Sequence, residues 1–345
     1  MRHAIALSVL CFLCSLLGCE ARAPASLEFS GPTMGTTYSV KIARPPAGLT
    51  VATLRAEIER ILAEVVATLS TYDPDSELSR LNRDSRTDWI PVSPALYAVL
   101  AEGQRLAALT GGAFDITVGP LVNLWGFGPE ARRTGVPSAA EIAAARARVG
   151  WRLLELHTER AAVRKARPDL YLDLSALGEG VGVERMAAAL RARGLTDYLV
   201  AVAGTLRASG RNAHGRSWTV AIEEPLPEQR VAHLLVPLAA RAISTSGDYR
   251  NFFEHEGRRY AHEIDPHTGV PVARALGSVT VLGDDAMTVD GLATALMVLG
   301  ETRGPALAAA EGIAAYFIVR DGARARGFGS PAWNASVGVA TATAP

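Results

Sequence analysis

The side chains of this sequence that could do chemistry gather between residues 242 and 300. Three polar clusters interrupt an apolar stretch there: a hydroxyl-rich turn at residues 244–248, a histidine beside an Asp-Pro turn at residues 262–269, and the pair Asp290 and Thr294. Hydroxyl groups donate hydrogen bonds to phosphate oxygens, a positioned histidine accepts a proton, and carboxylate and hydroxyl oxygens bind divalent cations. Together these clusters predict chemistry on a phosphate-bearing group.

Asp290 and Thr294 are four residues apart in an apolar pattern of helical spacing, which places both on one face of a helix. A purely structural interpretation makes Asp290 an acidic residue at the start of a helix capped by Thr288. That interpretation leaves Thr294 unexplained, because its neighbours are Ala, Leu and Met. The pair therefore favours a metal site.

His262 is expected at the end of a strand, directly before the turn at Asp265 and Pro266. A single histidine is more often structural than catalytic. Here, however, the proline-fixed turn and Gly269 would hold the segment rigidly, as a general base requires. We expect His267, in the same segment, to be solvated.

Two glycine-rich segments could approach a ligand. Residues 173–182 carry three glycines at alternate positions, in a turn expected between a strand and a helix, where free backbone amides bind anionic oxygens. Alone, these glycines fit a tight turn equally well. Their G-x-G-x-G spacing, with no acidic residue ending the next strand, argues against a nicotinamide-dinucleotide fold. Residues 112–120 and 123–128 suit an aromatic ligand or a packing corner.

Composition limits the classes of partner. The 345 residues include 35 Lys and Arg against 35 Asp and Glu, so the chain has no net charge. This balance argues against nucleic acid or an anionic membrane surface as the main partner. A hydrophobic content of 49% is typical of a folded globular protein, and the length allows one large domain or two ordinary ones.

The N-terminus has the pattern of a secretory signal peptide over residues 1–18, with two basic residues before an apolar run. It ends in Leu-Leu-Gly-Cys, which resembles a bacterial lipobox with Cys19 as the lipidated first mature residue. The alternative is an ordinary signal peptide with an incidental cysteine. Acyl chains on Cys19 would anchor the protein at a membrane of the bacterial cell envelope, facing the periplasm.

Residues 19–26 then form a short lipidated tether, and residues 27–345 form one domain. All three cysteines lie in the N-terminal segment, so this domain has no thiol to pair. An oxidising compartment therefore has no effect on it, and its stability must come from its core.

Apolar periodicity predicts an α+β fold with mixed or antiparallel sheets and packed helices, and no fixed-period repeat. Helices are expected at residues 50–69, 77–82, 94–109, 141–149, 183–193, 289–299 and 304–310. Strands are expected as a pair within residues 27–42 broken at 31–35, and at 151–157, 161–165, 170–174, 198–202, 206–209, 218–222, 232–243, 259–264, 278–282 and 314–319.

In chain order, these segments resemble the ApbE family of FAD:protein FMN transferases. The resemblance is carried by the motifs at residues 31–38, 70–79, 113–115, 173–182, 244–249, 262–271 and 290–300. No single motif decides the assignment, but seven in the same order make it strong.

The resemblance implies an ApbE-like fold and a Mg²⁺-dependent reaction. FAD is cleaved at its pyrophosphate, FMN is joined to a threonine hydroxyl of an acceptor protein, and AMP leaves. The positions that match FAD contacts are Met34, Tyr72, Ala113, Phe114, Asp115, Asp173, Glu179 and Ile264. The positions that match magnesium ligands are Ala176 (through its backbone carbonyl), Asp290 and Thr294, and His262 matches the proposed base.

The expected partners are FAD and flavoprotein subunits of membrane redox complexes, of the sodium-pumping NADH:quinone reductase or Rnf type. One alternative is an FAD pyrophosphatase, in which water replaces the threonine. Another is a non-catalytic FAD-binding lipoprotein. Retention of His262, Asp290 and Thr294 favours an enzyme.

Four features depart from the family pattern. Residues 201–205 read Ala-Val-Ala-Gly-Thr, where many relatives have an acid, paired glycines and another acid. Val181 stands where an aromatic residue is common, and Glu179 replaces the lysine of some branches. Ala293 removes a carboxylate that some relatives place before the helix threonine. The changes at residues 201–205 and at Ala293 lower the negative charge of the expected site, which would weaken metal binding and leaves room for the binding-protein alternative.

Overall fold

The computed structural model describes residues 26–130, 135–227, 229–273, 275–321 and 324–337. The predicted signal peptide and Cys19 lie outside the described residues, and so does the tether apart from Ser26, which begins the first strand. Within the described ranges, no helix is long and apolar enough to cross a membrane.

An eight-stranded sheet forms the centre of the described molecule, in the order β1-β2-β6-β7-β10-β13-β14-β15. Its strands are β1 (Ser26–Thr33), β2 (Thr36–Ala43), β6 (Tyr198–Val202), β7 (Thr205–Ser209), β10 (Ala242–Gly247), β13 (Leu276–Gly283), β14 (Ala314–Asp321) and β15 (Arg324–Gly329). Every neighbouring pair is antiparallel. The expected α+β class with an antiparallel sheet is confirmed.

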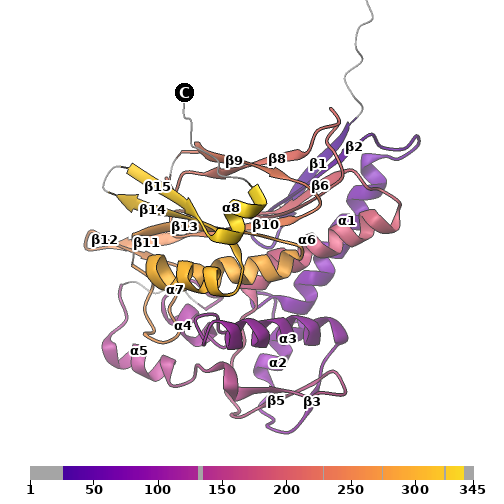
Figure 1. Cartoon of the computed structure of the whole chain (residues 1–345). Helices are drawn as coiled ribbons and strands as arrows, with labels where there is room; N and C mark the ends of the chain where they lie inside the picture. Colours follow the sequence, from indigo (N-terminus) through magenta and orange to yellow (C-terminus); the bar gives the residue numbers. More distant parts are fainter. Residues whose placement is uncertain (1–25, 131–134, 228, 274, 322–323, 338–345) are drawn as a thin grey trace, which may run out of the picture.

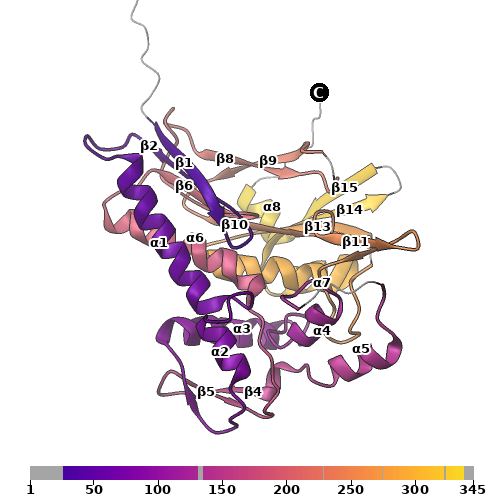
Figure 2. The ribbon, with the colours of Figure 1, turned by 180° about the vertical axis from the view of Figure 1, so that it is seen from behind.

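Helices cover one face of this sheet (Figure 1). The long ones are α1 (Val51–Leu69), α3 (Pro94–Leu109), α6 (Ser175–Ala192) and α7 (Ala286–Ala310). Seen from behind, α1 runs beside α6 and the β1–β2 hairpin, with α3 further from the sheet (Figure 2). The shorter ones on this side are α2 (Glu77–Arg83), α4 (Gly119–Leu124) and α5 (Ala139–Arg146). The main hydrophobic core lies between these helices and the sheet.

Smaller elements complete the fold. The pair β8 (Trp218–Glu223) and β9 (Ala232–Leu238), with α8 (Pro331–Val337), covers the other face of the sheet around a second core. The strands β3 (Ile90–Pro91), β4 (Leu154–Leu156) and β5 (Ala162–Lys165) form a small sheet near α2 and α3, and β11 (Phe252–His255) pairs with β12 (Arg258–Ala261).

Local sequence signals explain most element boundaries. The β1–β2 hairpin turns at Met34 and Gly35, whose φ angles are 48° and 71°. Thr50 caps α1 by accepting from the amide of Thr53. The two helices expected at residues 289–299 and 304–310 are joined within α7 at Gly300, where φ is 78° and the backbone is not helical.

The strand expected at residues 170–174 does not form, although the three leucines at its alternate positions are all buried. The side chain of Asn82 takes the place of a neighbouring strand: its Oδ1 accepts from the amide of Leu172 at 2.8 Å, and its Nδ2 donates to the Leu172 carbonyl at 2.9 Å. An alternating pattern cannot reveal that the hydrogen-bond partner is a side chain.

Other boundaries differ more modestly. The strand expected at residues 151–157 is a turn of 3-10 helix, Trp151–Leu153, followed by β4. The strand expected at residues 232–243 is divided between two strands, β9 and β10, and the elements that were not predicted at all are β3, α4, β11, β15 and α8. Most are too short for a periodic pattern to stand out.

Candidate active site

Helices α6 and α7 approach closely near their first turns. Helix α6 begins at Ser175, so most of the segment at residues 173–182, expected as a glycine turn before a helix, belongs to the helix itself. A methyl group on Gly180 would overlap the backbone of Ala286 and Met287 on α7. Gly180 therefore serves helix–helix contact, because only glycine lets the two backbones come this near.

Asp290 is the centre of a buried polar network between α6, α7 and the sheet. Its Oδ2 accepts from the backbone amide of Gly180 at 2.9 Å, and its Oδ1 accepts from Thr205 Oγ1 at 3.1 Å and from Ser244 Oγ at 3.2 Å. Burial raises the pKa of Asp290 well above its usual range, and the charge of Glu179 raises this pKa further. Three donors thus fix the orientation of the carboxylate.

Thr294 lies one helical turn after Asp290 and meets the next hydroxyl on the same face of β10. Its Oγ1 is 3.2 Å from Ser246 Oγ. Two strand residues advance about 6.6 Å and four helix residues about 6 Å, so Ser244 and Ser246 stay in register with Asp290 and Thr294. The hydroxyl-rich segment expected as a turn therefore lies mostly in strand β10. Because alternate residues of a strand point to the same face, Ser244 and Ser246 both point toward α7.

The interpretation of Asp290 as helix-start chemistry is wrong. Helix α7 begins at Ala286 with Asp285 as its N-cap, and the Asp285 side chain accepts from the amide of Thr288 at 2.8 Å. Thr288 is not the cap, and its hydroxyl donates to Glu102 Oε1 at 2.8 Å. Because Asp290 lies beyond the first turn, the helix dipole does not account for it.

Glu179 brings a second carboxylate to the network. Its Oε2 accepts from the amide of Gly204 at 3.2 Å and from Thr205 Oγ1 at 3.4 Å, both in the β6–β7 hairpin that departs from the family pattern. Ala203 of this hairpin has a φ of 44°, a conformation that glycine adopts more readily. Burial raises the pKa of Glu179, while these hydrogen bonds and the charge of His262 lower it.

The contacts between α6 and α7 also place Ala176. Gly180 on α6 contacts Ala286 on α7, and Leu177, about one turn earlier on α6, contacts Gly291, more than one turn later on α7. The two helices therefore run antiparallel. Ala176 therefore lies at the level of the two predicted ligands on α7.

The three predicted ligands Ala176, Asp290 and Thr294 offer only oxygen atoms, namely a carbonyl, a carboxylate and a hydroxyl oxygen. The Gly180 amide, which in a regular helix donates to the Ala176 carbonyl, donates to Asp290 Oδ2. Within the described residues, no group of three or more His, Cys, Asp and Glu side chains could hold a metal ion. The donor set thus suits a hard cation such as Mg²⁺ that takes its remaining oxygens from a substrate phosphate or water.

His262 follows β12, at the end of a strand as expected, although the strand ends at Ala261. The ring is partly exposed. Its Nδ1 lies 3.2 Å from the backbone oxygen of Asn251, and the ring meets Phe127 edge-on with the centroids 6.4 Å apart. The β11–β12 hairpin is held against α4, since the Tyr260 ring stacks on Trp125 at 5.4 Å.

The turn after His262 is fixed as the sequence predicted. The amide of Gly269, at a φ of 76°, donates to the Asp265 carbonyl at 2.8 Å, and the Gly269 carbonyl accepts from Trp125 Nε1 at 2.9 Å. His267 is exposed, but its Nε2 also lies 3.1 Å from the Gly111 carbonyl oxygen. It is therefore solvated only in part.

The loop after α3 holds three predicted FAD contacts, and their side chains are engaged within the protein. Asp115 Oδ1 accepts from the amide of Thr117 at 2.8 Å, and Oδ2 accepts from the amide of Trp151 at 2.9 Å. Burial raises the pKa of Asp115, opposed by these hydrogen bonds. Ala113 and Phe114 are both buried. A ligand would therefore meet mainly the backbone of this loop.

Two further predicted contacts lie at the edges of this region. Asp173 Oδ1 accepts from the amide of Ser175 at 2.9 Å, at the start of α6. Ile264 is buried and forms an isolated bridge with Pro271, in the apolar cluster around α4. Both help to hold the elements that carry the network and His262.

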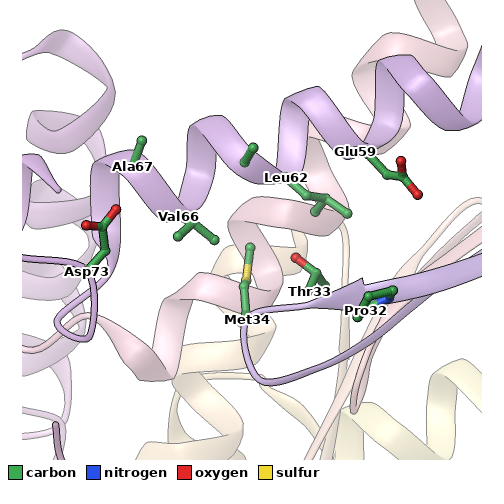
Figure 3. A pocket seen from close by; sticks show the side chains of 9 residues that line it. Pro32, Thr33, Met34, Glu59, Leu62, Val66, Ala67 and Asp73 are labelled. Atoms are coloured by element: carbon green, nitrogen blue, oxygen red, sulfur yellow. The ribbon is translucent and has the colours of Figure 1, made fainter. Parts of the chain in front are cut away.

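Met34 and Tyr72 lie near a cavity beside α1 (Figure 3). The cavity has a volume of about 410 Å³ and is lined by Pro32, Thr33, Met34, Glu59, Leu62, Ala63, Val66, Ala67 and Asp73. Figure 3 shows the Met34 side chain pointing from the β1–β2 turn toward α1. Tyr72, next to Asp73, is 64% exposed, and its hydroxyl donates to the Phe127 carbonyl at 2.8 Å. Its ring can stack on a planar ligand.

Two polar residues of the site were missed as functional candidates. Thr205 was noted only as a departure from the family, yet its hydroxyl joins Asp290, Ser244 and Glu179. Its pairing with Ser244 follows from the register of β7 against β10, which no local pattern reveals. Glu263, beside His262, is 5% exposed. The sequence does not reveal this burial, because a glutamate next to a turn is usually exposed to solvent.

Comparison with known proteins gives a consistent result. The chain matches the ApbE family over residues 34–317. It is 46% identical over 314 residues to the FAD:protein FMN transferase of Vibrio cholerae serotype O1, covering 91% of this chain and 93% of that one. It is 42% identical over 312 residues to the enzyme of the same name from Haemophilus influenzae, covering 89% and 90%.

Solved structures agree. The flavin transferase ApbE from Vibrio cholerae superposes with a TM-score of 0.84 at 43% identity, covering 90% of this chain and 99% of that one. The apo form of the flavinyl transferase ApbE from Pseudomonas stutzeri gives a TM-score of 0.84 at 40% identity, covering 92% and 98%.

Proposed function

Because the chain belongs to the ApbE family, as its motifs predicted, we propose that it transfers FMN from FAD to a threonine hydroxyl of an acceptor flavoprotein, with release of AMP. Relatives covering most of this chain are named FAD:protein FMN transferases. The observation that carries the proposal for this chain is the Asp290 network, with His262 close enough for its charge to act on Glu179. This supports a site in which the proposed cation ligands and the proposed base would act on the same substrate.

FAD would bind across the elements that meet there. The side chain of Met34 lines the cavity beside α1. The exposed ring of Tyr72, next to the lining residue Asp73, would stack on a planar ring. The backbone of residues 113–115 and the start of α6 would lie against the polar parts of the ligand, although the amides of Ala113 and Phe114 already donate to Thr110. Asp115 acts indirectly, because its carboxylate fixes the loop.

Asp290, Thr294 and the carbonyl of Ala176 would hold Mg²⁺. The cation would neutralise charge on the pyrophosphate when bound. One side-chain carboxylate with a hydroxyl and a carbonyl is a sparse set, which fits a cation that binds together with substrate phosphates. Thr205 and Ser244 keep the Asp290 carboxylate oriented from the other side.

His262 would act as the general base. It takes the proton of the acceptor threonine hydroxyl, whose oxygen bonds to the phosphorus of the FMN half of FAD, and the bond from that phosphorus to the bridging oxygen of AMP breaks. The ring is exposed enough to meet a protein substrate, and the hairpin and the turn at residues 265–269 fix its backbone.

We further propose that the protein is lipid-anchored through Cys19 in the bacterial cell envelope and faces the periplasm. Its acceptors would be flavoprotein subunits of membrane redox complexes, of the sodium-pumping NADH:quinone reductase or Rnf type. The lipobox-like ending of the N-terminal segment supports the anchor.

One experiment separates the proposed reaction from its alternatives. The protein is incubated with FAD, Mg²⁺ and a candidate acceptor subunit, and the acceptor is weighed while AMP and FMN are quantified. Transfer predicts an acceptor heavier by one FMN less water, and one AMP for each acceptor modified. Free FMN with an unmodified acceptor would indicate a pyrophosphatase, and FAD recovered intact would indicate a binding protein. An acceptor with valine at the modified threonine is the matched control.

A further inference from the structure

Glu263 is a buried carboxyl group to which no other described residue donates a hydrogen bond. Its residue is 5% exposed, and neither Oε1 nor Oε2 has a hydrogen-bond partner among the described residues. Burial raises its pKa. A buried carboxyl left unsatisfied destabilises a fold, and such an arrangement is found most often where the group has a function.

The charged group in closest contact with Glu263 is His262. Glu263 Oε2 lies 3.3 Å from His262 Nδ1, within ion-pair distance although not in hydrogen-bond geometry. Asp248 and Arg320 also act on Glu263, but they are paired with each other, since both guanidinium nitrogens of Arg320 donate to the Asp248 carboxylate. Arg320 is therefore already paired, and the group that can still form an ion pair with Glu263 is the His262 ring when it is protonated.

The same geometry assigns the tautomer of His262. Its Nδ1 faces two acceptors, the Glu263 carboxyl oxygen at 3.3 Å and the Asn251 carbonyl oxygen at 3.2 Å. A nitrogen between two acceptors carries the hydrogen, so Nε2 has the free lone pair. The base of the proposed reaction is thus Nε2.

We propose that Glu263 is a positioning residue for the transfer reaction, which holds His262 with Nε2 unprotonated and stabilises the imidazolium formed when Nε2 takes the threonine proton. This inference rests on the proposed function. The proton moves from the threonine oxygen to Nε2, the positive charge appears on the ring, and Glu263 faces that charge as a carboxylate. The proton then leaves Nε2 for solvent or for the departing AMP phosphate.

The first test needs no transfer activity. In the ¹⁵N spectrum of the full-length protein, neutral His262 is expected as the Nδ1–H tautomer. In Glu263→Gln the pH at which half of the His262 rings are protonated should be lower, because removal of a carboxylate disfavours the imidazolium. Glu179, the other carboxylate whose charge reaches His262, is unchanged in this comparison. An Nε2–H tautomer in the wild type, or the same titration in both proteins, would overturn the proposal.

The second test follows transfer. Glu263→Gln should lower the rate by about 10- to 100-fold, the range for loss of a group that orients a functional histidine, and should move the acid limb of the pH–rate profile to lower pH. Glu254→Gln, which removes an exposed carboxylate of the same hairpin, should change neither. A lower rate with an unmoved acid limb would mean that Glu263 acts only in packing. Failure of all variants and of the wild type to transfer FMN would refute the proposed function and leave the ¹⁵N result standing.

Discussion

The backbone amide of Gly180 on α6 donates to Asp290 Oδ2 on α7 at 2.9 Å. This one contact joins the two helices that carry the predicted metal ligands. It requires both a glycine, so that the backbones can approach, and a buried carboxylate that accepts from the amide. Packing and the orientation of the site therefore depend on the same residue.

Substitution of Gly180 by alanine should separate the two helices. The added methyl group overlaps the backbone of Ala286 and Met287, which cannot rotate away. We expect a loss of about 1–3 kcal/mol in the free energy of unfolding, as for overpacked cores, together with loss of transfer.

Gly178→Ala is the matched control for stability, because it lies on the same helix and a methyl group there meets no atom within 4 Å. It should raise the stability by up to about 1 kcal/mol through helix propensity. Urea unfolding of both variants measures the contrast. Equal stabilities would show that α6 and α7 do not constrain position 180.

Local patterns predicted those parts of the structure whose cause is local. The helix at residues 94–109 and the strand at residues 198–202 follow from apolar spacing and turn signals alone. The role of Thr205 could not be read this way, because it depends on the register of β7 against β10. The side chain of Asn82 replaces a strand through contacts 90 residues distant along the chain. The pair Asp290 and Thr294 was predicted from helical spacing and Ala176 from the resemblance, whereas the hydrogen bonds that orient Asp290 became visible only from the fold.

Asp290→Ala should abolish Mg²⁺-dependent transfer while FAD binding survives at least in part. The change removes the only carboxylate of the proposed ligand set and also removes the acceptor that Asp290 offers to the Gly180 amide. Transfer is measured against Mg²⁺ concentration, and FAD affinity by flavin fluorescence on the same preparation.

Asp285→Ala is the control for the helix, because Asp285 caps α7 without joining the network. It should lose about 1 kcal/mol of stability and retain its Mg²⁺ dependence. If Asp290→Ala also retained its Mg²⁺ dependence, Asp290 would have only a structural role.

Cys19→Ser should release the protein from the membrane or impair its export. The lipobox-like sequence would make Cys19 the acylated residue, and acyl chains contribute about 0.8 kcal/mol per buried methylene. Cys14→Ser, within the same segment, should leave fractionation unchanged. A Cys19→Ser protein that stays as firmly in the membrane fraction as the wild type contradicts the anchor.

His262→Ala should reduce FMN transfer by about 10²- to 10⁴-fold, the range for loss of a general base, with FAD affinity nearly unchanged. The Gly269–Asp265 hydrogen bond keeps the local backbone in place without the ring. Single-turnover transfer and FAD affinity are measured on one folded preparation. His267→Ala is the matched control, and should stay close to the wild-type rate. Transfer by His262→Ala within a factor of about three of the wild type, far below the general-base range, would falsify the catalytic role.

Glu263→Gln should make the protein more stable as the pH rises, even though it impairs transfer. Burial raises the pKa of Glu263 in the folded state, whereas an unfolded glutamate has a pKa of about 4.3. Between these two values the folded protein binds more protons than the unfolded chain. The free energy of unfolding of the wild type therefore falls as the pH rises through this window.

Glutamine has no proton to lose, so the variant lacks this fall, and its advantage over the wild type should grow as the pH rises above about 4.3, the pKa of an unfolded glutamate. We expect a gain of about 0.5–2 kcal/mol, as is common when a functional site is relieved of an unfavourable group. Urea unfolding of the apoprotein across this pH range measures the difference, with Glu254→Gln as the exposed control. If the free energies of unfolding of Glu263→Gln and of the wild type changed in parallel with pH, the pKa of Glu263 would be the same in the folded and the unfolded protein. A gain in stability with a loss of transfer would instead identify Glu263 as a group that destabilises the resting protein and acts when His262 becomes charged.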